Sequence, residues 1–303
     1  MTRRWWILVL GGTALLGAGL YWHFSRTTLV SELRWGGDAS GGEPYLIEKR
    51  QGQPAGFEGE LAQYFAKELG FPPRFVQRDW AQLPQDLSRR DVDLILNGYE
   101  WFPAREDVMT STIPYFAYRL RLIVRRDSPL KGWDDLRRQP GKPRIRVGVL
   151  RDSAAQRYLE HHFAGEVEVE GYDQEGVTGV MLKVGDGSLP ATVQDGPAAN
   201  WYLRQPEFSS LHAVGEPLKP TAFNYYVGYV RKEDRDLKTR LYGAIRKGLQ
   251  DGTIRTIFEK YGVWDEDQAN LLEAGKDWPP QELAERPSRM WFFWNLVLAA
   301  GMT

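Results

Sequence analysis

The sequence has no cysteine, and only four of its 303 residues are histidine. The missing thiols exclude disulfide bonds, thiol catalysis, thiolate metal sites and cysteine-linked lipid anchors. With so few histidines we expect no metal centre, and no motif indicates a cofactor. The charges nearly cancel, with 39 basic and 40 acidic residues, so the basic excess typical of nucleic-acid binding is missing. The composition, 42% hydrophobic and 26% charged, is typical of a folded globular protein with about two domains.

A long apolar run follows two arginines at the amino end. It extends over 20 residues, from Trp5 to Phe24, which is about the length that a bilayer core requires. Its aromatic last residues are typical of a membrane interface and make a poor cleavage site for a signal peptidase. We therefore favour an uncleaved membrane anchor at 1–27, with a cleaved signal peptide as the alternative. Because Arg3 and Arg4 favour the cytoplasmic side, we expect the rest of the chain outside the cytoplasm.

The carboxyl end carries a second apolar run, from Met290 to Met302, which is too short to span a bilayer as a helix. Two interpretations stay open for this tail at 290–303. It is either a short interfacial or core-docked helix, or the start of a transmembrane helix whose continuation this chain lacks. The stretch before it is polar and contains Trp278-Pro279-Pro280, so we predict a linker at 266–289.

Strand-like and helix-like patterns alternate between the two ends, as in an α/β protein. Buried strands are expected at 92–96 and 145–150. Apolar residues at helical spacing predict helices at 61–69, 154–163, 177–184, 237–249 and 254–261.

Two β-rich stretches, 118–126 and 224–231, bear on the domain organisation. If both cross between two lobes, one lobe consists of 33–123 and 226–265, and the other consists of 127–223. Two such crossings would form a hinge.

Short motifs follow one another in a definite order along the alternating region. They are Gly56-Phe57-Glu58-Gly59-Glu60-Leu61, Trp80 with Leu83 and Leu87, Asp91-Val92-Asp93-Leu94-Ile95, the run from Asn97 to Arg105, Pro114-Tyr115-Phe116, Val147-Gly148-Val149-Leu150 with Ser153, Val193-Gln194-Asp195, and Asp251-Gly252-Thr253 with Phe258 to Tyr261. Each motif alone is weak, but the ordered set resembles the bacterial extracellular solute-binding proteins of family 3. These are the periplasmic amino-acid-binding components of ABC transporters.

The resemblance implies a two-lobed α/β periplasmic-binding-protein fold with two hinge strands. Together with the two ends, this gives an inner-membrane-anchored, monomeric binding domain in the periplasm, with an N-terminal transmembrane helix and a short C-terminal apolar helix. The resemblance further implies a protein that is not an enzyme, closes its lobes on a free amino acid and presents it to an ABC permease. Because some members are fused to their permease, the tail is compatible with a truncated fusion.

Three residues match positions that contact the ligand backbone in this family. The resemblance implies that Arg105 grips the ligand's α-carboxylate and that Asp195 accepts hydrogen bonds from its α-ammonium. A guanidinium suits a carboxylate because it donates two parallel hydrogen bonds. Ser153 begins a helix, where backbone N–H groups favour an anion. The plainer alternatives are a surface arginine, a turn-forming aspartate and an ordinary helix cap.

Specificity depends on a further set of positions. Trp80 and Tyr45 match the family's aromatic clamp, although either could be ordinary core. Asp38 lies where cation-selective members often carry an acid. An acidic pocket would favour lysine, arginine, ornithine or histidine as the ligand, with glutamine as a neutral possibility.

Three residues depart from the family pattern. Asn97 and Gly98 replace commoner small hydroxyl residues, and Glu100 stands where serine or threonine is more usual. Glu100 could add a second acid to the pocket, or it could pair with Arg105 in the cleft. We therefore assign nine candidate ligand-binding residues, which are Asp38, Tyr45, Trp80, Asn97, Gly98, Glu100, Arg105, Ser153 and Asp195.

Two other functions stay open. A membrane-tethered sensor would pass closure to a partner, but no output domain lies in this chain. An enzyme of the dehydratase type would use carboxylates such as Asp38, Glu58, Glu100 or Asp195 as acid or base, but no catalytic triad or metal-ligand spacing is present. We favour the importer component over both.

Overall fold

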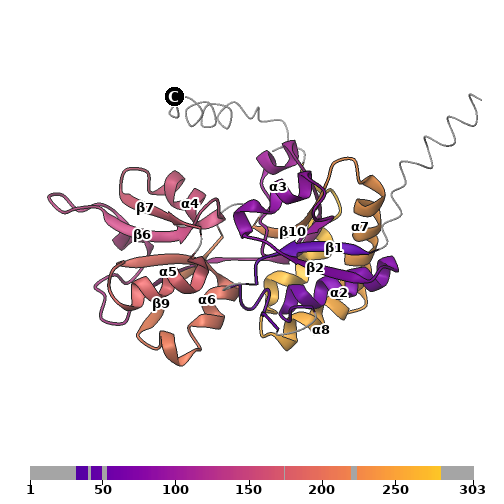
Figure 1. Ribbon diagram of the computed structural model, residues 1–303. Coiled ribbons are helices and arrows are strands. Elements are labelled where there is room, and N and C mark those ends of the chain that lie inside the picture. Colours follow the sequence, from indigo (N-terminus) through magenta and orange to yellow (C-terminus); the bar gives the residue numbers. More distant parts are fainter. Residues whose placement is uncertain (1–31, 40–41, 50–52, 174, 220–223, 281–303) are drawn as a thin grey trace, which may run out of the picture. The chain divides into compact units, whose positions relative to one another are not determined.

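The computed structural model describes residues 32–39, 42–49, 53–173, 175–219 and 224–280. Two five-stranded mixed sheets organise this part of the chain, and each carries its own helices (Figure 1). The predicted anchor at 1–27 and the predicted tail at 290–303 lie outside the described residues. Within the described ranges, no helix is both long enough and apolar enough to cross a bilayer.

The first sheet and its helices form what we call lobe 1. The strand order is β2-β1-β3-β10-β4, and the strands are β1 (Leu33–Gly37), β2 (Pro73–Gln77), β3 (Leu94–Ile95), β4 (Thr110–Ala117) and β10 (Tyr225–Val230). β1 runs parallel to β2 and β3, whereas β10 runs antiparallel to β3 and β4. The helical elements are α2 (Phe57–Leu69), η1 (Trp80–Gln82), α3 (Leu83–Ser88), η2 (Pro103–Asp107), α7 (Arg235–Gln250), α8 (Thr253–Lys260), η5 (Glu266–Asn270) and α9 (Leu271–Ala274).

The second sheet and its helices form lobe 2. The strand order is β7-β6-β8-β5-β9, and the strands are β5 (Leu120–Arg125), β6 (Ile145–Leu150), β7 (Val167–Tyr172), β8 (Ala191–Asp195) and β9 (Leu211–Leu218). β6 runs parallel to β7 and β8, and β5 runs antiparallel to β8 and β9. The helical elements are η3 (Trp133–Leu136), α4 (Ala154–His162), α5 (Gly176–Gly185), α6 (Gly196–Tyr202) and η4 (Pro206–Phe208).

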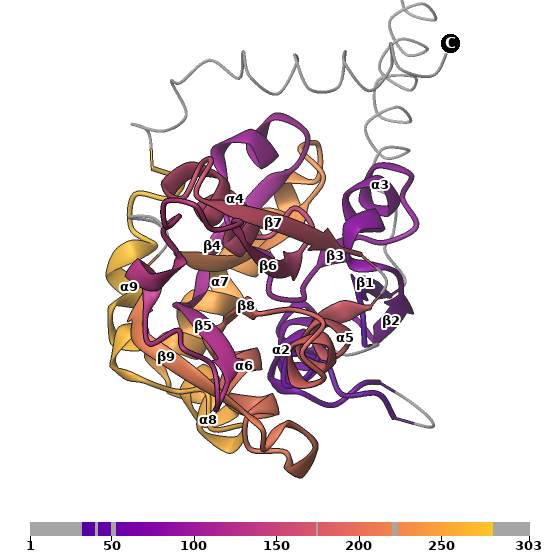
Figure 2. The same ribbon diagram turned by 90° about the vertical axis from the view of Figure 1, so that its left-hand side faces the viewer.

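The strand order explains where the helices lie. In lobe 2, α4 leads from β6 outward to β7, and α5 leads from β7 back past β6 to β8. Right-handed crossovers in opposite directions place their helices on opposite faces of a sheet, and α4 and α5 lie on opposite faces in Figure 2. In lobe 1, α2 and α3 connect β1, β2 and β3 in the same pattern. Each lobe therefore has a switch point where the strand order reverses.

The predicted helices and strands are confirmed, but two predicted boundaries differ. β5 belongs wholly to lobe 2, because Leu120 pairs with Asp195 of β8 and with Leu218 of β9. The first crossing between the sheets therefore lies at Tyr118 and Arg119 and not after residue 123. The β-rich run is continuous in sequence across this point, so the change of sheet leaves no break in the pattern.

The first part of the predicted linker is folded. η5 and α9 pack against lobe 1, and Gln268 is 2% exposed. The Gln268 side chain accepts a hydrogen bond from the Ala117 N–H at 2.8 Å and donates one to the Ala117 carbonyl at 2.9 Å. Farther along, the Trp278 indole donates to Ser111 Oγ at 3.1 Å. The Gln268 amide thus satisfies the backbone hydrogen-bonding groups at the end of β4. The segment is folded although its polar composition is typical of a linker.

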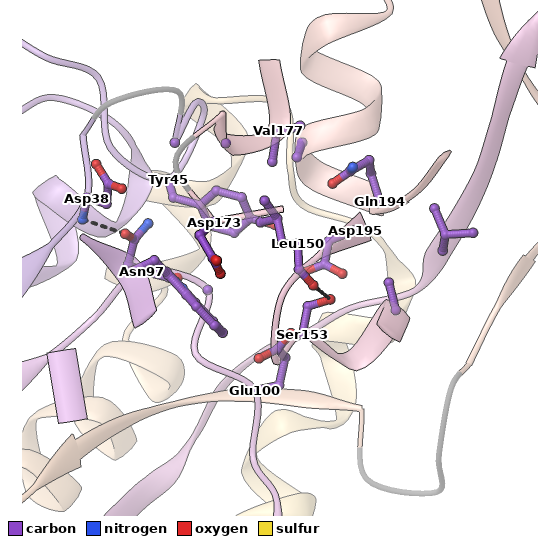
Figure 3. A pocket seen from close by; sticks show the side chains of 17 residues that line it. Asp38, Tyr45, Asn97, Glu100, Leu150, Ser153, Asp173, Val177, Gln194 and Asp195 are labelled. Atoms are coloured by element: carbon purple, nitrogen blue, oxygen red, sulfur yellow. Dashed lines mark hydrogen bonds between the residues drawn. The ribbon is translucent and has the colours of Figure 1, made fainter. Parts of the chain in front are cut away.

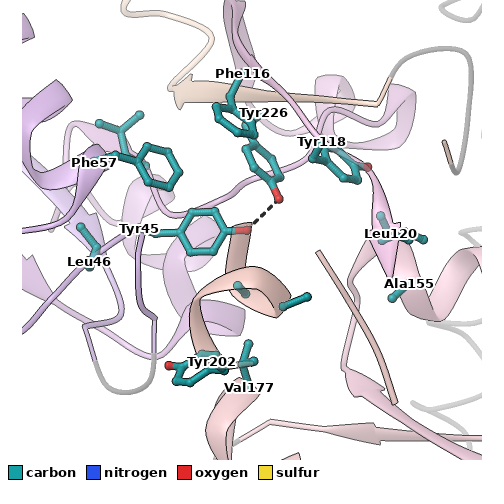
Figure 4. Packing of buried hydrophobic residues seen from close by; sticks show 14 of the residues in the cluster. Tyr45, Leu46, Phe57, Phe116, Tyr118, Leu120, Ala155, Val177, Tyr202 and Tyr226 are labelled. Carbon is teal, nitrogen blue, oxygen red and sulfur yellow. Dashed lines mark hydrogen bonds between the residues drawn. The ribbon is translucent and has the colours of Figure 1, made fainter. Parts of the chain in front are cut away.

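Stacked aromatic rings extend from the core of lobe 1 to the crossing (Figure 4). Phe57 stacks on Phe116 with ring centroids 5.4 Å apart, and Phe116 stacks on Tyr226 at 5.5 Å. Tyr226 in turn stacks on Tyr118 at 4.6 Å, with the ring planes 5° apart. The Tyr118 N–H donates to the Asn224 carbonyl at 3.0 Å, so the chain that leaves lobe 1 after Tyr118 lies beside the residue that precedes β10. These contacts fix the position from which lobe 2 extends.

A buried ion cluster ties the strands of lobe 1 together. Asp93, which is 2% exposed, accepts hydrogen bonds from Arg34 at 2.7 and 2.8 Å and from Arg231 at 2.8 Å. Burial opposes the charge of this carboxylate, but the hydrogen bonds from Arg34 and Arg231 outweigh it and hold the pKa of Asp93 below its usual value. Arg34 lies in β1, and Arg231 follows β10.

We expect Asp93→Asn to lower the free energy of unfolding by about 2–4 kcal/mol, because it removes the buried carboxylate that Arg34 and Arg231 share and leaves Arg231 with only the less buried Asp234 as a counter-charge. Urea unfolding of the full chain measures this loss. The control is Asp91→Asn, which removes an exposed carboxylate two residues away and should change stability by no more than about 0.5 kcal/mol. Equal, small effects of both changes would contradict the structural role of the cluster.

Candidate ligand-binding site

A cavity lies between the lobes. Its lining consists of Asp38, Gly42, Tyr45, Trp80, Asn97, Gly98, Glu100, Leu150, Ser153, Ala155, Asp173, Gly176, Val177, Val193, Gln194, Asp195 and Ala198 (Figure 3).

The fold brings these side chains together at the carboxyl ends of parallel strands. Asp38 follows β1 and Asn97 follows β3, while Ser153 follows β6, Asp173 follows β7 and Asp195 ends β8. Open α/β sheets bind ligands at this edge, at the point where the strand order reverses. The two switch points face the same cavity.

A tight turn at Asn97 and Gly98 forms the lobe 1 wall. The Gly98 N–H donates to both carboxylate oxygens of buried Glu58, at 2.8 and 3.0 Å. Gly98 has φ +62°, and a Cβ there would lie 3.0 Å from the Tyr45 ring, so the position requires glycine. The Asn97 side-chain oxygen accepts a hydrogen bond from the Asp38 N–H at 2.6 Å. Gly98 thus shapes the cavity wall through its own backbone conformation, and Asn97 does so by bonding the backbone of Asp38.

The two predicted clamp residues line the cavity and also pack as core. The Trp80 indole donates to the Asn97 carbonyl at 2.9 Å, and its ring lies 4.4 Å from that of Tyr99. Tyr45 is 6% exposed, and its hydroxyl lies 2.9 Å from that of Tyr226. Tyr45 belongs to the core of lobe 1 and Trp80 packs against that core, while the role of both residues as a clamp on a ligand stays a prediction.

Glu100 forms the most consequential contacts in the site. Its Oε2 lies 3.2 Å from Arg105 Nη1, and its Oε1 accepts a hydrogen bond from the Ala154 N–H at 2.9 Å. Ala154 is the first residue of α4, so the bond joins lobe 1 to lobe 2. Arg105 is largely buried and does not line the cavity. The pairing of Glu100 with Arg105, left open from the sequence, is the arrangement in this structure.

Ser153 caps α4. Its hydroxyl accepts a hydrogen bond from the Gln156 N–H at 3.3 Å and donates to the Leu150 carbonyl at 2.7 Å. Ser153 also lines the cavity. The capping role considered from the sequence is thus present at the cavity wall.

Asp195 is the carboxylate in lobe 2 nearest the crossing. Its Oδ2 accepts a hydrogen bond from the Tyr226 hydroxyl at 2.5 Å, across the two lobes. Burial and the facing Glu100 carboxylate raise the pKa of Asp195 to about 8, although the bond from Tyr226 acts in the opposite direction. A partly buried carboxylate beside a second carboxylate is stabilised in its charged form by a cationic partner.

Eight of the nine predicted residues line the cavity, and Arg105 lies behind it against Glu100. The sequence analysis missed Asp173, Gln194 and the apolar wall that includes Leu150 and Val177. Asp173 pairs with Arg151 at 2.8 Å. Its position after a strand was a usable signal, but the β7 segment had not been predicted as a strand.

The chain matches the family model described as bacterial extracellular solute-binding proteins, family 3, over residues 33–263. It therefore belongs to this family. The histidine-binding periplasmic protein of Escherichia coli (strain K12) is 26% identical over 226 residues, which cover 73% of this chain and 84% of that protein.

Two solved structures show the same fold. The arginine-, lysine-, histidine-binding protein ArtJ from Geobacillus stearothermophilus has a TM-score of 0.69 at 22% identity, and the match covers 79% of this chain and 99% of ArtJ. An ancestral amino acid-binding protein, a precursor of cyclohexadienyl dehydratase, has a TM-score of 0.66 at 24% identity. That match covers 78% of this chain and 98% of the ancestral protein. The relatives named here are binding proteins, and one of them is the precursor of an enzyme.

The pH dependence of stability tests the turn at the cavity wall. Burial raises the pKa of Glu58 to about 7, against the hydrogen bonds from Tyr115 and Gly98. Between about pH 4.5 and 7, the folded state therefore keeps a proton that the unfolded state releases, and this group makes stability fall as the pH rises.

We expect Glu58→Gln to remove this contribution, which amounts to a slope of up to about 1.4 kcal/mol per pH unit. Urea unfolding of the full chain at several pH values measures the slope. Glu68→Gln, an exposed position on the same helix, is the control and should retain the wild-type slope. Parallel profiles for wild type and Glu58→Gln would contradict the account.

Proposed function

We propose that this protein is a membrane-anchored periplasmic receptor that closes its two lobes on a small cationic ligand of the amino-acid type and delivers it to an ABC permease. The candidates from the sequence are lysine, arginine, ornithine and histidine, with glutamine as the neutral alternative. The proposal depends on the acidic cavity, in which the partly buried Asp195 carboxylate is hydrogen-bonded to a neutral hydroxyl. The relatives' names support an amino-acid-type ligand.

The chemistry of the lining supports a cation. Four carboxylates line the cavity, on Asp38, Glu100, Asp173 and Asp195, and no lysine, arginine or histidine is among its described lining residues. Glu100 and Asp173 each have an arginine partner. Asp38 accepts a hydrogen bond from the Gln77 side chain at 2.7 Å. We therefore assign the ligand ammonium to Asp195, which is bonded to a neutral hydroxyl.

The contribution of both lobes to the cavity lining supports a receptor that closes on its ligand. The lining comes from both lobes, so a bound ligand contacts both and favours the arrangement in which they meet. An N-terminal anchor would hold the receptor near its permease and raise the effective concentration. A sensor that reports closure to a separate partner would use the same site and is the alternative.

A thermal-shift screen tests the proposal directly. The full chain is heated with each of the twenty amino acids, ornithine, citrulline and simple biogenic amines. Cationic compounds should raise the melting temperature by about 5–10 °C at a hundredfold excess over Kd. A rise confined to neutral or acidic compounds would contradict the cationic preference, and no rise with any compound would contradict the proposed function.

Asp195→Asn should weaken binding of the best cation by about 2–4 kcal/mol, or at least roughly 30-fold in Kd, because the ligand ammonium loses its counter-charge. Asparagine retains an acceptor for the Tyr226 hydroxyl, so the fold should be preserved. Calorimetric titration measures the loss. Asp134→Asn removes a carboxylate that is 98% exposed in the same lobe and should leave Kd unchanged. Unchanged binding by Asp195→Asn would exclude the assigned role.

Binding should also depend on pH. Because a cation prefers ionised Asp195, whose pKa is raised to about 8, affinity should rise from about pH 6 to pH 8 and level off above that, by at most about tenfold per pH unit. Calorimetry in two buffers of different ionisation enthalpy at pH 7 should detect proton release with a ligand that does not itself titrate in this range. Asp195→Asn should abolish the release. A flat profile for the wild type would contradict the assignment.

A further inference from the structure

The Glu100 carboxylate lies between two donors that together suit an anion. Arg105 supplies a guanidinium on one side, and the N-terminus of the nine-residue helix α4 supplies the Ala154 N–H on the other. A fixed guanidinium and a helix N-terminus both favour a carboxylate. Here the carboxylate belongs to the chain itself, and Glu100 is 1% exposed.

We propose that Glu100 occupies the position a ligand carboxylate would take, so that the cavity selects organic cations without a carboxylate over the corresponding amino acids. The ligand class is then a diamine or guanidinoamine, such as a decarboxylated basic amino acid. This inference rests on the proposed function, because it assumes that the cavity is the ligand site.

The donors that would hold a ligand carboxylate are already engaged. Arg105 Nη1 donates to the Glu100 carbonyl at 2.5 Å as well as contacting its carboxylate, and Nη2 donates to the Asp152 carbonyl at 3.4 Å. The guanidinium carbon also lies 4.6 Å from the Tyr99 ring centroid and 4.9 Å from that of Phe102. A second carboxylate would have to displace Glu100 or lie beside it, where like charges in a buried site repel each other.

The rest of the cavity suits a cation with an apolar stem. Asp195 faces the cavity from lobe 2, and Asp38 faces it from lobe 1 (Figure 3). Aromatic and aliphatic side chains, including Tyr45 and Val177, contribute to the wall between them. A methylene chain would pack against this wall while a terminal ammonium meets Asp195.

Glu100 also takes over a task that a ligand carboxylate would perform. Its bond to the Ala154 N–H crosses from lobe 1 to lobe 2, so the anionic link between the lobes is internal. A ligand then has to supply only the cationic link. A decarboxylated ligand therefore loses nothing by lacking the carboxylate.

Matched pairs of compounds test this inference with the full chain. The pairs are cadaverine and lysine, putrescine and ornithine, agmatine and arginine, and histamine and histidine. Calorimetric titration of the wild type should give at least one amine a Kd at least tenfold below that of its amino acid. Glu100→Ser vacates the position, so the preference of that pair should shift toward the amino acid by at least tenfold.

Glu233→Gln, which removes an exposed carboxylate paired with Arg90, is the control and should retain the wild-type preference. A wild type that binds each amino acid as tightly as its amine, or more tightly, overturns the inference and leaves the proposed function intact. If Glu100→Ser binds amino acids while the wild type binds none of the eight compounds, both the inference and the proposed cation binding are overturned. Failure of both proteins to bind any of the eight compounds overturns the proposed function itself. The wild-type comparison needs no variant, so it stays decisive if Glu100→Ser fails to fold.

Discussion

A carboxylate that is almost fully removed from water needs charge or hydrogen bonds to offset the loss of hydration. Glu100 obtains both, from the guanidinium of Arg105 and from the Ala154 N–H at the start of α4. One of these partners belongs to lobe 1 and the other to lobe 2. The electrostatic requirement of a single side chain thus couples the packing of Arg105, the position of α4 and the distance between the lobes.

The fold supplies the setting for this interaction. Each lobe contains parallel strands whose order reverses, and the carboxyl ends of those strands face one cavity. Stacked rings from Phe57 to Tyr118 hold the crossing in place. Asp195 stands at the end of β8, bonded to Tyr226 of lobe 1. The cavity is therefore acidic at the place where the two lobes meet, and this supports the proposed preference for a cationic ligand.

Much of this arrangement could be predicted from the sequence, since apolar spacing placed the main helices, the ordered motifs contain six of the predicted residues of the cavity wall, and the family resemblance added Asp38 and Tyr45. Asp173 was missed because the edge strand before it alternates polar and apolar residues and is not a buried run. η5 was missed because Gln268 is polar yet buried against β4. The pairing of Glu100 with Arg105 was predicted only as one alternative. The sequence could not decide because the conformation of Glu100 also depends on its bond to Ala154, which lies 54 residues away in the chain and in the other lobe.

The central claim is that Glu100, and not the ligand, holds the anionic position between Arg105 and α4. Crystal structures of the full chain grown with cadaverine and with lysine test it most directly. The account predicts that Glu100 keeps its contacts to Arg105 and Ala154 in the cadaverine complex, with a ligand ammonium at Asp195. A lysine carboxylate seated between Arg105 and the Ala154 N–H, with the Glu100 side chain turned away, would contradict it.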